Sequence, residues 1–199
     1  MGCGPGKSEC TVTHMASSIL STAEARRDTV ISAAVSEFAL TGYLGTPIAA
    51  VAARAKISTA YVFKLFPSKE LLFVAALDHC IELTEAVLAE GADAATDSSP
   101  EAVLYAMGGA YAQLVADREL LLLQVHAQAA AGVPEIGAAV RRGIKRITEF
   151  AKSRSGASDA DVQEFMARGQ LCHMLVASGI EPDAGSWARL LHAGIRHPD

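Results

Sequence analysis

The chain has 199 residues, of which 51% are hydrophobic and 20% are charged, so one or two small domains can bury a core without metals or disulfides. The formal net charge of −5 excludes a protein that is coated with basic residues. Aromatic residues make up only 6%, and the abundance of alanine and leucine favours helices.

The four cysteines are widely spaced and form no CxxC pair. This usage favours a reducing compartment, so we expect a cytoplasmic protein without disulfides. No apolar run is long enough to span a membrane, and we expect no metal and no cofactor.

Residues 1–21 are expected to form a disordered tail. The letters GPGKS near the start resemble a phosphate-binding loop, but that pattern requires a glycine at the position of Met1 and a preceding strand. Cys3, Cys10 and His14 are three ligands in a glycine-rich segment, which is weak evidence for a zinc site.

The next segment predicts two helices in close succession. Residues 22–40 carry apolar side chains at i, i+4 spacing, and Gly42 follows where a left-handed residue ends a helix. Thr46 is the predicted N-cap of the second helix, with Pro47 as its first residue and an end near residue 55.

A third, short helix is predicted from the cap Ser58 to residue 65. Its inward positions are Val62 and Phe66, with Leu65 as a further candidate. The outer face is then formed by Thr59, Ala60, Tyr61, Phe63 and Lys64. Ser68 then caps a fourth helix that runs to about residue 90.

Two short helices joined by a turn and packed on a first helix form a helix-turn-helix, whose second helix lies in the DNA major groove. The charge distribution agrees with this interpretation. Residues 23–70 carry a net charge of +2 and residues 71–199 a net charge of −7, as expected when only the first part meets a polyanion.

Residues 23–72 resemble the DNA-binding region of the TetR family of transcriptional regulators. The matching positions are Phe38, Gly42, Tyr43, Thr46, Ile48, Ala52, Ala55, Ser58, Phe63, Phe66, Lys69 and Glu70. The resemblance implies an all-α fold with a helix-turn-helix DNA-binding domain at residues 22–67. Residues 68–199 would form a helical bundle for ligand binding and dimerisation.

The resemblance also implies a set of DNA contacts. Thr46 and Lys69 would bind phosphate, and the remaining contacts would come from the outer face of the third helix, at Thr59, Ala60, Tyr61, Phe63 and Lys64. The chain departs from the family pattern at several positions, so the operator sequence does not transfer. The departures are Lys56 and Ala60 in place of glycine, Phe63 in place of tyrosine, and Leu65 in place of histidine or tyrosine.

From about residue 100 the chain predicts further helices, at about 101–116, 118–131, 134–153, 158–178 and 183–195. In the family the last two long helices dimerise. The side chains that would form this interface, or would instead fill the monomer core, are Leu171, Leu175, Trp187, Leu190 and Leu191.

A ligand cavity between these helices would be apolar with a few polar groups. The side chains that would line it, or would instead be ordinary core residues, are Met107, Tyr111, Gln124, His126, Phe165, Met166 and His173.

The leading hypothesis is a ligand-responsive transcriptional regulator. It would be a repressor that binds a palindromic double-stranded DNA operator as a homodimer and is released by a small-molecule effector. An enzyme on a helical bundle is a second hypothesis, but the sequence contains no evident nucleophile–base set and no HExxH motif. A helical interaction module with a vestigial helix-turn-helix is a third.

Overall fold

The computed structural model of the chain describes residues 9–195, with side chains from residue 23 onward. This part of the chain contains nine α-helices and no strand, which confirms the all-α prediction. The helices in chain order are α1 (Glu9–Gly45), α2 (Ile48–Arg54), α3 (Thr59–Leu65), α4 (Lys69–Asp93), α5 (Pro100–Val115), α6 (Arg118–Ala129), α7 (Pro134–Ser155), α8 (Asp159–Ser178) and α9 (Ser186–His192).

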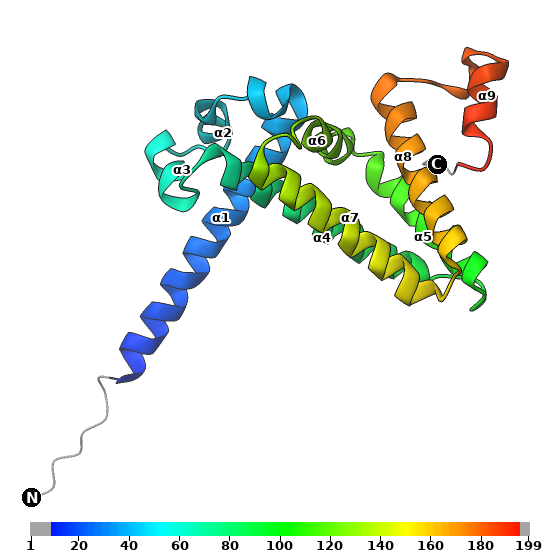
Figure 1. Cartoon of the computed structure of the whole chain (residues 1–199). Helices are drawn as coiled ribbons and strands as arrows, with labels where there is room; N and C mark the ends of the chain where they lie inside the picture. The colour runs from blue at the N-terminus through cyan, green and yellow to red at the C-terminus, as the bar shows by residue number, and fades with distance from the viewer. Residues whose placement is uncertain (1–8, 196–199) are drawn as a thin grey trace, which may run out of the picture.

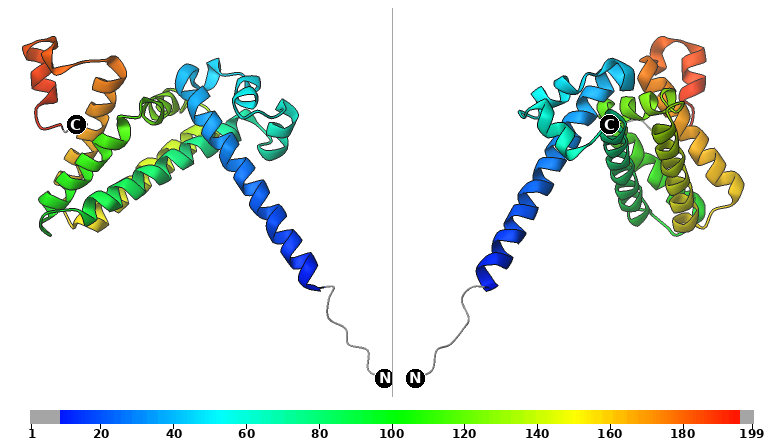
Figure 2. Two further views of the ribbon diagram at one scale, coloured as in Figure 1. Left: turned by 180° about the vertical axis from the view of Figure 1, so that it is seen from behind. Right: turned by 60° about the vertical axis from the view of Figure 1, so that its left-hand side comes forward.

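The C-terminal part of α1 carries α2 and α3 on one side, and these three helices form the head of the molecule (Figure 1). The other helices form the body, in which the long helices α4 and α7 pack side by side. Helix α6 lies on α1 where the head meets the body, and α5 and α8 close the far end (Figures 1 and 2).

The first helix is longer than the sequence predicted. A disordered tail was expected through residue 21, but the structure places residues 9–21 in α1. Neither glycine nor proline occurs between Glu9 and Thr41, so nothing in the local sequence breaks the helix. These turns extend away from the rest of the chain (Figure 2). Residues 1–8 lie outside the described residues.

Gly42 interrupts α1 as predicted, with φ 71° and ψ 179°. The prediction that Thr46 caps α2 is wrong, because Pro47 occupies the N-cap position and α2 begins one residue later. The Thr46 hydroxyl donates to the carbonyl oxygen of Gly42 at 2.7 Å, and the Thr46 amide donates to the same oxygen. Thr46 therefore closes the end of α1 instead of opening α2.

Serine caps begin three of the other predicted helices. The hydroxyls of Ser58, Ser68 and Ser158 accept hydrogen bonds from the backbone amides of the first turns of α3, α4 and α8. In α8 the cap is reciprocal, because the Asp161 carboxylate accepts from the Ser158 amide. These helix starts confirm the sequence prediction.

The C-terminal end differs from the prediction of one helix over residues 183–195. Gly179 ends α8 in a left-handed conformation, as expected, but Pro182–Ala184 form a 3-10 turn. Gly185 has φ 141° and separates this turn from α9, which is only seven residues long. Gly185 divides the predicted helix because its positive φ is not helical, and glycine adopts this backbone conformation without the strain that a side chain would cause.

One hydrophobic core joins the head to the body. Phe38 of α1 packs edge-on against Phe73 of α4, with ring centroids 4.8 Å apart. Val51 and Val62 from α2 and α3 belong to the same cluster as Leu123 of α6. The position of the head is therefore set by α1, α4 and α6 together.

We predict that Gly42→Ala destabilises the fold more than Gly156→Ala. Both glycines have positive φ, but a Cβ at Gly42 would lie 2.8 Å from Nδ1 of His126, whereas a Cβ at Gly156 meets nothing within 4 Å. We expect urea unfolding to show that Gly42→Ala lowers the free energy of unfolding by about 3 kcal/mol and Gly156→Ala by about 1 kcal/mol. His126→Ala should relieve part of the Gly42→Ala loss. Equal losses for the two glycines would contradict the importance of this contact.

Candidate functional site

Helix α3 presents one buried face and one open face. Val62 and, just beyond the helix, Phe66 are buried against the rest of the head. Ala60, Phe63 and Lys64 are exposed. Thr59 and Tyr61 are half-buried at the edges of the open face. The structure therefore places all five predicted α3 residues on or beside a surface that the described part of the chain leaves uncovered.

Two arginines of α1 flank α3, and the sequence analysis missed them. Arg27 donates from its guanidinium to the Leu65 carbonyl oxygen at 3.0 Å and stacks over the Phe66 ring at 4.1 Å. The Arg26 guanidinium lies 6.0 Å from the ring centroid of Tyr61. The adjacent pair was visible in the sequence, but its proximity to α3 depends on how the helices cross.

The turn between α2 and α3 has the left-handed residue that the sequence pattern requires. Lys56 has φ 56°, the only positive φ of a non-glycine residue in the described part of the chain. A side chain in this conformation costs about 1 kcal/mol or more relative to glycine. Lys56 is exposed, so the turn gains a cation at the edge of the head.

Thr46 does not fit its predicted contact with phosphate. Thr46 is only 1% exposed, and its hydroxyl is bonded to the backbone carbonyl oxygens of Glu37 and Gly42 rather than free. Lys69 is half-buried at the start of α4, with its Nζ 5.0 Å from the ring centroid of Tyr43. Partial burial lowers the pKa of Lys69, while the neighbouring Glu70 carboxylate opposes that change.

Tyr43 and Glu70 fasten the end of α1 to the start of α4. The Tyr43 hydroxyl donates a hydrogen bond to the Glu70 carboxylate. This bond lowers the pKa of Glu70, and together with burial it raises the pKa of Tyr43 to about 12. The pair fixes the first turn of α4, which carries Lys69, relative to the head.

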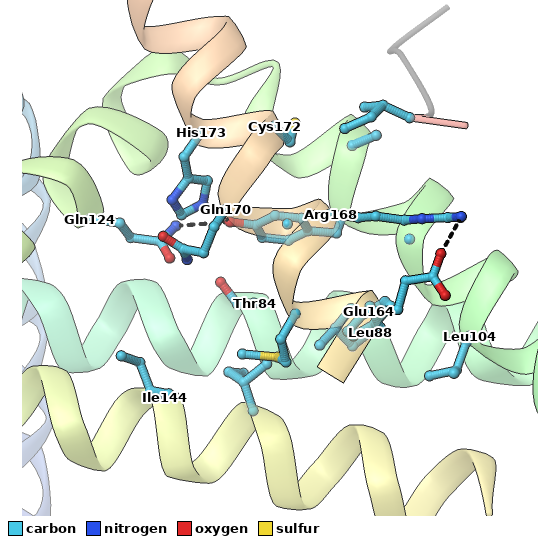
Figure 3. Close-up of a pocket in the computed structure, with 18 of the residues that line it drawn as sticks. Thr84, Leu88, Leu104, Gln124, Ile144, Glu164, Arg168, Gln170, Cys172 and His173 are labelled. Carbon is cyan, nitrogen blue, oxygen red and sulfur yellow. Dashed lines mark hydrogen bonds and ion pairs between the residues drawn. The ribbon is translucent and has the colours of Figure 1, made fainter. Parts of the chain in front are cut away.

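A cavity of about 590 Å³ lies in the body, between α4, α5, α6, α7 and α8 (Figure 3). Five of the seven predicted ligand residues line it: Tyr111, Gln124, Phe165, Met166 and His173.

The other two predicted ligand residues do not line the cavity. Met107 is fully buried in the core cluster of α4, α5 and α7. His126 lies against Gly42 at the head. The sequence analysis missed Thr84, Arg168 and Gln170, which carry no distinguishing motif but do line the cavity.

The polar side chains at one end of the cavity are hydrogen-bonded in series. Gln124 donates from Nε2 to the Tyr111 hydroxyl at 3.4 Å, and that hydroxyl contacts Nε2 of His173. The other ring nitrogen of His173, Nδ1, is buried and has no partner among the described residues. Burial lowers the pKa of His173 to about 4, so the ring is neutral at pH 7.

Comparison with known proteins identifies the head. Residues 30–76 match the family model described as bacterial regulatory proteins of the tetR family. The match covers the head and the first turns of α4, and it links this part of the chain to the TetR family. A search of curated proteins finds no significant match.

Solved structures share the whole TetR fold with this chain. A TetR-like transcriptional regulator from Rhodococcus is 24% identical, with a TM-score of 0.62 over 85% of this chain and 92% of that one. The regulator FadR from Bacillus subtilis, solved with stearoyl-CoA, is 15% identical, with a TM-score of 0.64 over 83% and 94%. The multidrug binding protein EbrR, solved with imidazole, is 19% identical, with a TM-score of 0.61 over 87% and 91%.

The match of residues 30–76 to the TetR family model supports a DNA-binding transcriptional regulator rather than an enzyme. Within residues 9–195 no helix combines the length and the apolar character that a membrane crossing needs. The same residues contain no group of three or more metal-ligating side chains. The Cys3, Cys10 and His14 set lies outside the residues whose side chains are described.

We predict that Tyr43→Phe lowers the free energy of unfolding by about 1 kcal/mol at about pH 7, because it removes a hydrogen bond to a charged group. The folded-state pKa of Glu70 is lowered, so the stabilisation is present above the unfolded pKa and is lost as pH falls through the folded value. The gap between wild type and variant in urea unfolding should therefore narrow at about pH 3. If the difference in unfolding free energy between wild type and Tyr43→Phe stayed constant with pH, the stabilising bond from Tyr43 to the charged Glu70 carboxylate would be contradicted.

Proposed function

We propose that the chain is a repressor that binds a palindromic operator as a homodimer and is released by a small molecule. The observation that carries the proposal is the open face of α3, which is anchored in the head by Val62 and Phe66 and is left uncovered by the residues that the structure describes. We assign DNA contacts to Thr59, Ala60, Tyr61, Phe63, Lys64 and Lys69, and add Arg26 and Arg27. Thr46 becomes a positioning residue.

Each α3 side chain has a distinct chemistry for DNA. Lys64 offers three N–H donors to guanine edges or phosphates, and the Tyr61 hydroxyl can donate to either. The exposed ring of Phe63 can contact a thymine methyl group. Arg26 lies close enough to Tyr61 to bind the phosphate backbone beside the groove. Because DNA is the partner, we propose a cytoplasmic location.

Dimerisation is proposed because two recognition helices must reach half-sites about one turn, ~34 Å, apart. Trp187 and Leu190 of α9 are 54% and 73% exposed, and Leu171 and Leu191 are half-buried. These four residues can contribute to an interface. Leu175 is buried inside the monomer and is removed from the predicted set.

Binding of a small molecule is supported by the cavity and by the solved relatives. FadR was solved with stearoyl-CoA and EbrR with imidazole, and EbrR is described as a multidrug binding protein. We propose that Tyr111, Gln124, Phe165, Met166 and His173 contact the effector. The division of the chain into a DNA-binding part at residues 22–67 and a ligand-binding part at residues 68–199 is part of the same proposal.

Helix α6 provides a route from the cavity to the head. Gln124 lines the cavity, and two residues later His126 contacts Gly42 at the break in α1. Glu119 of the same helix accepts a hydrogen bond from Ser36 of α1 at 2.6 Å. A ligand that binds one position of α6 more tightly than another will therefore bias the position of the head.

We predict that Lys64→Ala weakens DNA binding and lowers the salt slope of the logarithm of the binding constant by about one charge, because a lysine contact releases about one counterion. Gel shifts against the DNA upstream of the protein's own gene, at two salt concentrations, measure this. Lys145→Ala, in an exposed ion pair on α7, is the matched control and should change little. Equal effects of the two variants, or no sequence-specific complex, would contradict the proposal.

A further inference from the structure

We propose that the cavity binds an uncharged, largely apolar molecule whose carbonyl-type oxygen accepts a hydrogen bond from Nδ1 of His173, and that its mouth repels anionic ligands. The inference rests on the proposed function only in treating this cavity as the effector site. It adds the chemical class of the ligand.

The hydrogen-bond series favours the tautomer of His173 in which Nδ1 carries the proton. Nε2 of Gln124 donates to the Tyr111 hydroxyl, so that hydroxyl has its own hydrogen available for Nε2 of His173. Nε2 then acts as the acceptor, and Nδ1 carries the hydrogen. If the hydrogen were on Nε2 of His173 instead, the phenolic hydrogen of Tyr111 could not be donated to that nitrogen.

Nδ1 of His173 has no accessible surface in the structure, so a ligand oxygen can accept from it once a small turn of the ring opens this nitrogen to the cavity. His173 is 5% exposed, and its Nδ1 has no partner among the described residues. A buried donor without an acceptor is costly, and an entering carbonyl or ester oxygen would remove that cost. Because Nδ1 carries a hydrogen, it can donate but not accept, so the site selects a ligand atom that accepts a hydrogen bond.

This end of the cavity is electrically neutral. Burial lowers the pKa of His173 and raises the pKa of Tyr111, so both side chains are uncharged at neutral pH. Gln124 and Thr84 add only neutral polar groups. A carboxylate placed here would lose its hydration and gain no counter-charge, whereas an ester or ketone pays a much smaller desolvation penalty.

The charged residues that line the cavity are Glu101, Asp161, Glu164 and Arg168, which give a net charge of −2. All four are exposed. Glu164 and Arg168 already form an ion pair at 2.6 Å, and Figure 3 shows this pair on the opposite side of the view from Gln124 and His173. The Glu164 carboxylate offsets the charge of this guanidinium, and the two remaining carboxylates repel a phosphate or carboxylate head group.

Apolar side chains form much of the remaining lining of the cavity. They include Ile81, Leu88, Leu104, Ile147, Phe165 and Met166. A volume of about 590 Å³ lies within the range of small-molecule sites. The ligand is therefore mainly hydrocarbon, with its oxygen at the His173 end.

The test measures binding of matched ten-carbon probes to the full-length protein by calorimetry. Methyl decanoate should bind about tenfold more tightly than decane or decanoate, and decanoyl-CoA should bind most weakly. The proposal would be overturned if decanoate or decanoyl-CoA bound as tightly as the ester. It would also be overturned if none of the probes bound.

Two variants separate the roles of the two ends. His173→Phe should lose the preference for ester over decane, with His79→Phe, outside the cavity lining, as the control that keeps it. Glu101→Lys, at an exposed position that does not threaten folding, should strengthen binding of decanoyl-CoA and leave the ester unchanged. An unchanged ester preference in His173→Phe, or no gain for decanoyl-CoA in Glu101→Lys, would overturn the assignment.

Gel shifts on the same preparation keep this inference distinct from the proposed function. A sequence-specific DNA complex without ester binding would overturn the ligand assignment alone. Ester binding without any sequence-specific complex would overturn the regulator proposal alone.

Discussion

The contact between the break in α1 and helix α6 is part of the core that sets where the head lies on the body. Gly42 has a backbone conformation that side chains rarely adopt, and His126 occupies the space where a side chain would project. Thr46 closes the broken helix, and the bond from Tyr43 to Glu70 attaches it to α4. Val62 and Phe66 belong to the same core as these elements, so the contacts also hold the open face of α3 in one orientation.

That arrangement also explains how one helix can serve two sites. Leu123 of α6 is buried in the core shared with the head, whereas Gln124 faces the cavity. A rigid helix with neighbouring residues in both places cannot shift at one end without disturbing the other. The cavity is formed almost entirely by the body, so its ligand need not approach DNA to affect the head.

The sequence predicted the features that depend on local hydrogen bonds. Ser58 and Ser68 cap α3 and α4 because each hydroxyl needs only an amide three residues ahead. Thr46 was assigned wrongly because its hydroxyl finds carbonyl oxygens of the preceding helix, which depends on the turn at Gly42. The same limit hid Arg26, whose neighbour Tyr61 is distant in sequence.

The cavity was only partly predictable for a similar reason. Met107 and Tyr111 lie one turn apart on α5 and were equal candidates, yet one is core and the other lines the cavity. Periodicity identifies the inward face of a helix but not which inward residues meet a gap between their neighbours. The family pattern covered residues 23–72, so it predicted the general role of the body but not which of its residues line the cavity.

The central claim is that the open face of α3 enters the DNA duplex. Amide hydrogen exchange of the full-length protein, with and without a DNA fragment selected by the protein from a random pool, tests it most directly. The account predicts slower exchange in Thr59–Leu65 and in the first turn of α4, with α5 unchanged. Protection confined to the body, with exchange in α3 unaltered by bound DNA, would contradict it.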